Sequence, residues 1–188
     1  MEFEDLTIPE VLEQIRHLSD DNIQQYYDHL VPIERAPTPE FWRTLDNRND
    51  ATLARWLCLL ACVASGFSII PFEFQLTATI ALLSGKDSLV DVGTGYGKTW
   101  CMILPALLRL NRITLVISPL KQLQVNQVLQ FKKFGIRTIS INEDAPNDDA
   151  LSKAATQSLS FNPSNSAPTT VTVHDSQEFS AITEASCL

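Results

Sequence analysis

The chain has 188 residues, of which 45% are hydrophobic, and a formal net charge of −8. This length fits one domain plus an extension, and the apolar content is enough for a buried core. The charge is uneven, because residues 86–142 hold eight basic and two acidic side chains between two acidic flanks. Nucleic-acid binding along the whole chain is therefore excluded. The middle third is the candidate anion-binding surface, and a solvated helix face is the alternative.

The four cysteines have neither the paired spacing of a zinc site nor that of a disulfide framework. They predict reduced thiols in an intracellular protein, nuclear or cytoplasmic. No basic segment leads into an early apolar stretch, so we expect no signal peptide. The uncharged residues 56–72 are interrupted by Ser, Gly and Pro, which favours a buried helix plus a loop over a membrane span.

Residues 1–64 predict a helical N-terminal extension. Thr7 and Glu10 have the spacing of a capping box, which begins a helix that reaches Leu18. Further helices are expected at 22–30, after Thr38, and at 51–64, with prolines marking a linker between the second and the third. No residue of this segment carries recognisable chemistry.

A glycine-rich turn at 93–97 follows a β-favouring run, Ser88–Val92, and precedes an apolar helical segment at 100–110. Strand, glycine turn and helix in this order are the context of a phosphate-binding loop. Glycines let the backbone N–H groups turn inward, Lys98 is placed to reach the β- and γ-phosphates, and Thr99 is placed to bind Mg²⁺. The alternative is a glycine turn that joins a strand to a helix by chance.

The rest of the pattern predicts an α/β fold with parallel strands and flanking helices. A helix is expected at 73–84, strands at 113–117 and 137–141, and between them a helix capped by Ser118 and closed by Gly135. Residues 143–170 are polar and are expected to be irregular or disordered, and 169–173 are the candidate for one more short strand. We thus expect a helical extension at 1–64, a partial ATP-binding domain at 65–142, and an irregular or disordered tail at 143–188.

Four elements occur in order: P-F-E-F-Q at 71–75, G-T-G-Y-G-K-T at 93–99, L-P-A-L at 104–107, and T-L-V-I-S-P-L at 114–120. Together they resemble the Q element, motif I and motif Ia of RecQ-type DNA helicases in superfamily 2, over about 75 residues. The resemblance implies part of a RecA-like domain of an ATP-driven motor, which moves 3′ to 5′ on single-stranded DNA. It implies ATP and Mg²⁺ as cofactors, with Gln75 at the adenine edge. Phosphate and Mg²⁺ contacts would come from Thr94, Gly95, Tyr96, Gly97, Lys98 and Thr99. Nucleic-acid contacts would come from Ser118, Pro119, Leu120 and Lys121.

The chain also departs from that family. Phe72 stands where the Q element usually has Arg, and Asp91 places a charge at the end of the expected buried strand. No Asp-Glu pair of the kind found in motif II occurs in the chain, and only Val171–Asp175 imitates it, with Asp175 as a weak candidate for a metal contact. The leading hypothesis is therefore an ATP-binding, nucleic-acid-binding helicase fragment with negligible hydrolysis. The alternatives are a non-enzymatic interaction module or a truncated product without function, and a small kinase is disfavoured. The sequence predicts no membrane contact and gives no oligomeric state.

Overall fold

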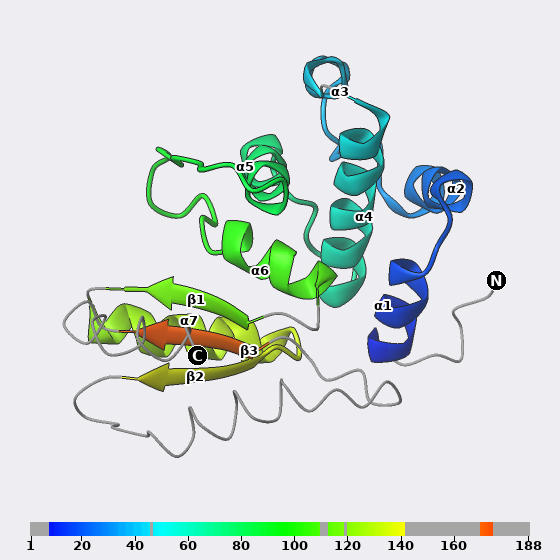
Figure 1. Ribbon diagram of the computed structural model, residues 1–188. Coiled ribbons are helices and arrows are strands. Elements are labelled where there is room, and N and C mark those ends of the chain that lie inside the picture. The colour runs from blue at the N-terminus through cyan, green and yellow to red at the C-terminus, as the bar shows by residue number, and fades with distance from the viewer. Residues whose placement is uncertain (1–7, 46, 110–112, 119, 142–169, 175–188) are drawn as a thin grey trace, which may run out of the picture. The chain divides into compact units, whose positions relative to one another are not determined.

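The computed structural model describes residues 8–45, 47–109, 113–118, 120–141 and 170–174. The chain divides into two compact units between Leu108 and Arg109 (Figure 1). The expected α/β composition is present in the described residues, because helices occur together with parallel strands. The units do not follow the expected boundaries after residues 64 and 142.

All the regular elements in the described part of the first unit are helices. Each expected helix is present within a few residues of its predicted bounds. The helices are α1 (Ile8–Arg16), α2 (Asp20–Leu30), α3 (Pro39–Thr44), α4 (Arg48–Ala64), α5 (Glu73–Leu83) and α6 (Trp100–Leu108). Three of them begin at side chains that accept a backbone N–H, namely Ser19, Thr38 and Asn47. The predicted cap at Thr7 lies outside the described residues.

Helix α4 is the centre of this unit and contacts α1, α2, α5 and α6 (Figure 1). Its residues 57–63 are all buried, with exposed fractions of 0–4%. A helix that is apolar on every side is stable only when neighbours cover all of it. The chain therefore continues through residue 64 without a boundary, because α1 and α2 cover one part of α4, and α5 and α6 cover another.

The strand expected at Ser88–Val92 is not formed, and this prediction was wrong. Residues 86–93 have irregular backbone, and the side chain of Leu89 is 96% exposed. A β-favouring run becomes a strand only when a neighbouring strand supplies hydrogen bonds and covers its side chains. Within the described residues, the sheet holds only the three strands of the second unit.

The second unit is a parallel sheet with one described helix. Strand β1 (Ile113–Ile117) leads into α7 (Lys121–Lys133), which leads into β2 (Arg137–Ile141). Strand β3 (Thr170–His174) lies between β1 and β2 and runs parallel to both (Figure 1). The strands expected at 113–117 and 137–141 are confirmed, and the one expected at 169–173 begins one residue later. The rest of the predicted irregular tail lies outside the described residues.

Helix α7 packs against β2 and β3, and its two ends differ from each other. Gly135 follows its C-terminus with φ +71°, and the N–H of Ile136 reaches the carbonyl of Phe131 at 3.2 Å, as expected for a glycine-closed helix. At the other end the predicted cap was wrong. The N-cap residue is Leu120, without a capping side chain, and the hydroxyl of Ser118 is buried without a hydrogen-bond partner.

The described cysteines, Cys58, Cys62 and Cys101, are free thiols. Burial raises the pKa of all three, so these thiols stay protonated near neutral pH. No helix in the described part of the chain is long and apolar enough to cross a membrane.

Candidate nucleotide site

The glycine-rich loop connects an irregular segment to the start of α6. Residues 94–96 form a turn, and Gly95 and Gly97 have φ angles of +89° and +71°. These angles lie in the left-handed region that side chains with a Cβ adopt at a cost. The glycines therefore sit where the backbone needs them, and they curl the loop immediately before α6.

The loop's backbone donors are available for a ligand. In the described part of the chain, the N–H groups of residues 94–99 donate no hydrogen bond, whereas those of Trp100 and Cys101 bond back to Gly97 and Lys98. The change coincides with the first residue of α6, whose N-terminus adds a partial positive charge. A cluster of free N–H groups at a helix N-terminus is suited to phosphate oxygens.

The ammonium group of Lys98 closes the loop on itself. Its Nζ donates to the carbonyl oxygen of Val92 at 2.7 Å and to that of Gly93 at 3.2 Å, and the side chain is exposed. The ammonium therefore lies beside the first residues of the loop, Val92 and Gly93. Phosphate oxygens that bind there exchange with two neutral carbonyls, and an ionic partner makes a stronger hydrogen bond than a neutral one.

Gln75 supports the loop from α5 and is only 2% exposed. Its Nε2 donates to the carbonyls of Tyr96 at 3.2 Å and Gly97 at 2.9 Å, while its Oε1 accepts the N–H of Phe72 at 2.9 Å. Both amide hydrogens are thus used inside the protein, and one lone pair of the oxygen remains. The structure places the amide of Gln75 against the loop, while its contact with an adenine edge, which the resemblance implied, stays a prediction. Its bonds to the loop backbone and to the start of α5 were not foreseen.

Two exposed aromatic side chains flank this link. The ring of Phe72 is 57% exposed and stacks on Phe74, with 6.0 Å between centroids. Tyr96 is 59% exposed, and a Cβ added at Gly93 would lie 3.4 Å from its ring. Flat apolar rings at the edge of a polar loop are suited to packing against a planar base.

Thr99, the predicted Mg²⁺ contact, lies just before α6 and is partly exposed. Its carbonyl accepts the N–H groups of Met102 and Ile103, which fixes the residue at the helix start. No group of three or more His, Cys, Asp or Glu side chains able to hold a metal occurs in the described ranges. Asp175 lies outside the described residues, directly after β3.

The predicted nucleic-acid segment follows β1 in the second unit, and its residues differ in exposure. Leu120 is 64% exposed and Lys121 is exposed, whereas Ser118 is 2% exposed, and Pro119 lies outside the described residues. Two hydrogen bonds in series link Ser118 to α7 and β2. Gln124 Nε2 donates to the Ser118 carbonyl at 2.9 Å, and the Ser140 hydroxyl donates to Gln124 Oε1 at 3.2 Å. The sequence did not indicate Gln124 or Ser140, because a Gln on a helix usually faces water.

The basic side chains of residues 86–142 belong to both units, with Lys86 and Lys98 in the first and the others in the second. Because these basic residues are divided between two units, a single anion-binding surface formed by residues 86–142 stays a prediction.

Comparison with known proteins gives matches over this same part of the chain. The family model of the DEAD/DEAH box helicases matches residues 72–174, more than half of the chain. A Caenorhabditis briggsae protein named for an ATP-dependent DNA helicase Q1 is 45% identical over 76 residues, which are 40% of this chain and 12% of that protein. The ATP-dependent DNA helicase RecQ of Pasteurella multocida is 48% identical over 62 residues, 33% of this chain and 10% of that protein. The ATP-dependent DNA helicase hus2/rqh1 of Schizosaccharomyces pombe is 35% identical over 95 residues, 48% of this chain and 7% of that protein. The chain thus spans about a tenth of the length of these relatives.

Proposed function

Since the chain belongs to the DEAD/DEAH box helicase family, we propose that its glycine-rich loop binds ATP and that residues 118–121 contact single-stranded DNA. The observation that carries the ATP proposal is the set of free backbone N–H groups at 94–99, which lies beside the Lys98 ammonium and at the N-terminus of α6. The likeness to RecQ helicases supports it, and so does the order of Q element, glycine loop and motif Ia. We propose further that residues 65–142 are part of a RecA-like motor domain.

The residues present fit a nucleoside triphosphate with Mg²⁺. Backbone N–H groups of Gly95 to Thr99 and the ammonium of Lys98 would hold the phosphates, and the Thr99 hydroxyl would bind Mg²⁺. The bound ion would supply neutralisation of the phosphate charge. Position 97 leaves little room for a residue larger than glycine, because a Cβ at Gly97 would lie 3.1 Å from the Gln75 amide nitrogen.

For the base, we propose a single acceptor rather than a two-point contact. Both hydrogens of Gln75 Nε2 bond to the loop, so the amide has only an oxygen lone pair to offer. That lone pair suits the exocyclic amino group of adenine, which is a donor, and not the carbonyl that guanine has at the same place. Phe72 would contribute apolar packing where the family usually has a cation.

For DNA, we propose that Lys121 and the N-terminus of α7 meet a backbone phosphate. This helix begins at Lys121, and its N-cap residue Leu120 provides no capping side chain. The ammonium of Lys121 and the partial positive charge of the helix N-terminus therefore lie at the same end. The exposed aliphatic side chain of Leu120 would pack against a sugar or a base. Ser118 is buried, and its part is to hold the segment through its carbonyl bond to Gln124.

We propose that this chain binds ATP more readily than it hydrolyses it. Phosphoryl transfer in this class needs a carboxylate that holds Mg²⁺ and a residue that orients the attacking water. The printed sequence has no Asp-Glu pair, and Asp175 after β3 is the remaining candidate for the first role. Hydrolysis by this chain therefore depends on whether Asp175 reaches the metal.

The test is the affinity of a fluorescent ATP analogue, measured with Mg²⁺ for the wild type, Lys98→Ala and Lys86→Ala. Loss of a charge-assisted hydrogen bond costs about 1.5–3 kcal/mol, so Lys98→Ala is expected to bind roughly tenfold to hundredfold more weakly. Lys86 is also exposed and lies in the same unit but outside the loop, so Lys86→Ala is expected to bind like the wild type. Equal binding by all three proteins would remove the site assignment.

A second measurement addresses turnover. ATP hydrolysis is followed with and without a single-stranded oligonucleotide, for the wild type and Asp175→Asn. The proposal expects no stimulation by DNA in either protein. Stimulated hydrolysis that disappears in Asp175→Asn would overturn the weak-hydrolysis proposal and assign the metal carboxylate.

A further inference from the structure

We infer that the helical segment before the family match, residues 8–64, is a positioning element for the nucleotide loop. Hydrogen bonds from it reach both helices that support the loop, α5 before it and α6 after it. The inference rests on the proposed function, since it states what sets the geometry of that same site. Residues 8–64 lie outside the matched range 72–174, and Arg16 and Glu73 are the residues that join the segment to the site.

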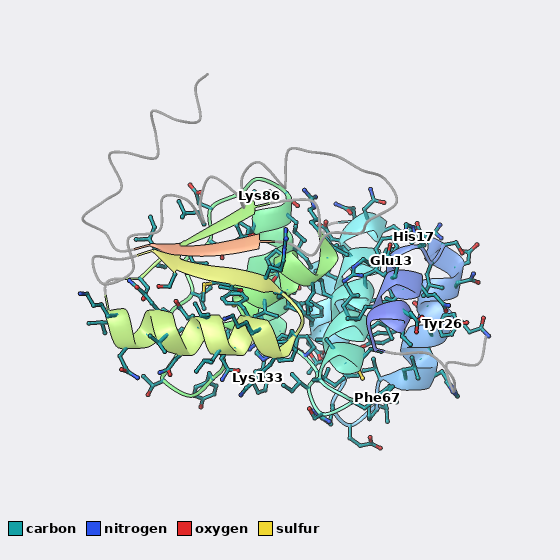
Figure 2. All side chains as sticks on the ribbon, turned by 90° about the horizontal axis from the view of Figure 1, so that it is seen from below. Glu13, His17, Tyr26, Phe67, Lys86 and Lys133 are labelled. Carbon is teal, nitrogen blue, oxygen red and sulfur yellow. The ribbon has the colours of Figure 1, made fainter. Side chains whose placement is uncertain are left out.

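The first contact is at the far end of the helix that leaves the loop. Arg16 Nε donates to the carbonyl oxygen of Leu107 at 2.9 Å, in the last turn of α6. Arg16 Nη1 also pairs with Glu13 Oε2 at 3.0 Å, and the other oxygen of that carboxylate lies 3.1 Å from His17 Nε2. Figure 2 shows Glu13 and His17 close together. A cation at the C-terminal end of a helix is favoured by the helix dipole. The Arg16 side chain is 13% exposed, so water screens this contact little.

The second contact is at the start of the helix that carries Gln75. The backbone N–H of Thr38 donates to the Glu73 carboxylate at 2.7 Å, in the first turn of α5. Three residues earlier, Arg35 Nη2 donates to the carbonyl of Ser68 at 2.7 Å. The connection between α2 and α3 is thereby fixed to residues 68–73. Gln75, two residues after Glu73, carries that position to the loop.

Helix α4 joins these two contacts into one body. Trp56 Nε1 donates to the carbonyl of Ile15 at 2.9 Å, which fixes α4 to the helix that presents Arg16. The buried residues 57–63 lie between that side of the unit and the helices α5 and α6. The loop itself is mostly exposed and depends for its own bonds on Lys98 and Gln75. Its conformation is therefore set by where α5 and α6 are held.

A preorganised loop binds more tightly than a mobile one, because less conformational freedom is lost on binding. The inference thus predicts that releasing Arg16 or Glu73 loosens the loop and weakens nucleotide binding without removing any group that touches the ligand. A merely structural role predicts a lower unfolding temperature with an unchanged loop in the folded molecules.

The test compares Arg16→Met with Arg43→Met, and Glu73→Ala with Glu40→Ala, in the full chain. Arg43 and Glu40 pair with each other at 3.1 Å on α3, are 75% and 76% exposed, and serve as matched controls. Amide hydrogen exchange is measured without nucleotide, and the affinity of the fluorescent ATP analogue is measured well below the unfolding temperature. Arg16→Lys, which keeps a cation able to reach the Leu107 carbonyl, is the rescue variant.

We expect Arg16→Met and Glu73→Ala to speed exchange in residues 100–108 by about tenfold, and the controls to leave it unchanged. The first N–H groups of this helix, those of residues 100–103, bond to the carbonyls of Gly97, Lys98 and Thr99, so their exchange reports on the loop. Nucleotide affinity is expected to fall by about fivefold in the same two variants and to recover in Arg16→Lys. Unchanged exchange at 100–108 in both variants would overturn the inference, whatever the nucleotide data show. Faster exchange in a protein whose wild type binds no ATP analogue would support the positioning role and refute the proposed function. If Arg16→Met does not fold, Glu73→Ala decides the same question, because its carboxylate is partly exposed and bonds a single backbone N–H.

Discussion

Replacing Gly97 by alanine tests the link between the loop and α5 most directly. Gly97 has φ +71°, and a Cβ built there lies 3.1 Å from Gln75 Nε2 and 3.5 Å from the ring of Trp100. The Gln75 amide cannot simply swing away, because three hydrogen bonds hold it. The substitution therefore forces a choice between a strained backbone contact and a displaced amide.

The magnitude follows from two terms that a control separates. A residue with a Cβ in the left-handed region costs about 1 kcal/mol. Each hydrogen bond lost from Gln75 adds about 0.5–1.5 kcal/mol, so displacement of its amide from Tyr96 and Gly97 adds roughly 1–3 kcal/mol. Gly85→Ala carries only the first term, because Gly85 has φ +73° with nothing within 4 Å of the added atom. Gly97→Ala is thus expected to lower the free energy of unfolding by about 2–4 kcal/mol, and Gly85→Ala by about 1 kcal/mol.

The assay is urea unfolding of both variants, with the affinity of the fluorescent ATP analogue measured in parallel. Gly97→Ala is expected to lose affinity as well as stability, because the displaced amide no longer orients the loop carbonyls. Gly85→Ala is expected to keep the wild-type affinity. Equal losses of stability in the two variants would refute the reasoning, since the Gln75 contacts would then contribute nothing.

Two further predictions concern buried polar groups. Ser118→Ala is expected to leave stability unchanged or slightly raised, because it removes a buried hydroxyl that has no partner. Ser140→Ala is expected to cost about 0.5–1.5 kcal/mol, because it removes the hydrogen bond from that hydroxyl to Gln124 Oε1. Urea unfolding of both variants measures the difference, and a larger loss in Ser118→Ala would contradict it. Burial raises the pKa of Cys58 and Cys62, so above about pH 8.5 the unfolded thiols ionise first and the free energy of unfolding is expected to fall as pH rises. Unfolding at pH 7.5 and 9.5 tests this, and a Cys58→Ala/Cys62→Ala protein with the same pH dependence would show that other groups cause it.

Local signals predicted the helices and two strands well, because caps, turns and apolar spacing act over a few residues. Gly135 marked the end of α7, and the β-branched run at 113–117 marked β1. The run at 88–92 was also expected to be a strand, although it contains Ser88 and Asp91, and it forms none. The two runs differ in their partner as well: β1 pairs with β3, which comes from more than fifty residues further along the chain. Strand formation depends on that distant pairing, which no local pattern contains.

The site was predictable in its parts and not in its connections. The spacing of glycines before Lys98 predicted a tight loop ahead of a helix, and the structure has this loop, with the lysine bonded to its backbone. Its binding of phosphate stays a prediction. The resemblance implied a role for Gln75 at the adenine edge, but the identity of a side chain does not say which of several acceptors its amide selects, and here the amide bonds to the loop carbonyls. Ser118 shows the converse case. Its position before a helix suggested a cap, but the N-cap residue is Leu120, and the hydroxyl of Ser118 is buried away from the helix start without a partner.

The segment before the family match contains an apolar run in α4 that matches no motif but indicates how the helix packs. Residues 57–63 read L-C-L-L-A-C-V, seven apolar residues within a helix that was correctly predicted. A helix with one partner needs an apolar stripe, whereas an apolar run that goes all the way round needs partners on every side. The sequence therefore already required elements on both sides of α4. The helices before it cover one side, and α5 and α6, which flank the nucleotide loop, cover the other. The apolar residues of α4 offer no catalytic or binding group, but their burial packs residues 8–64 against the two helices that flank the loop.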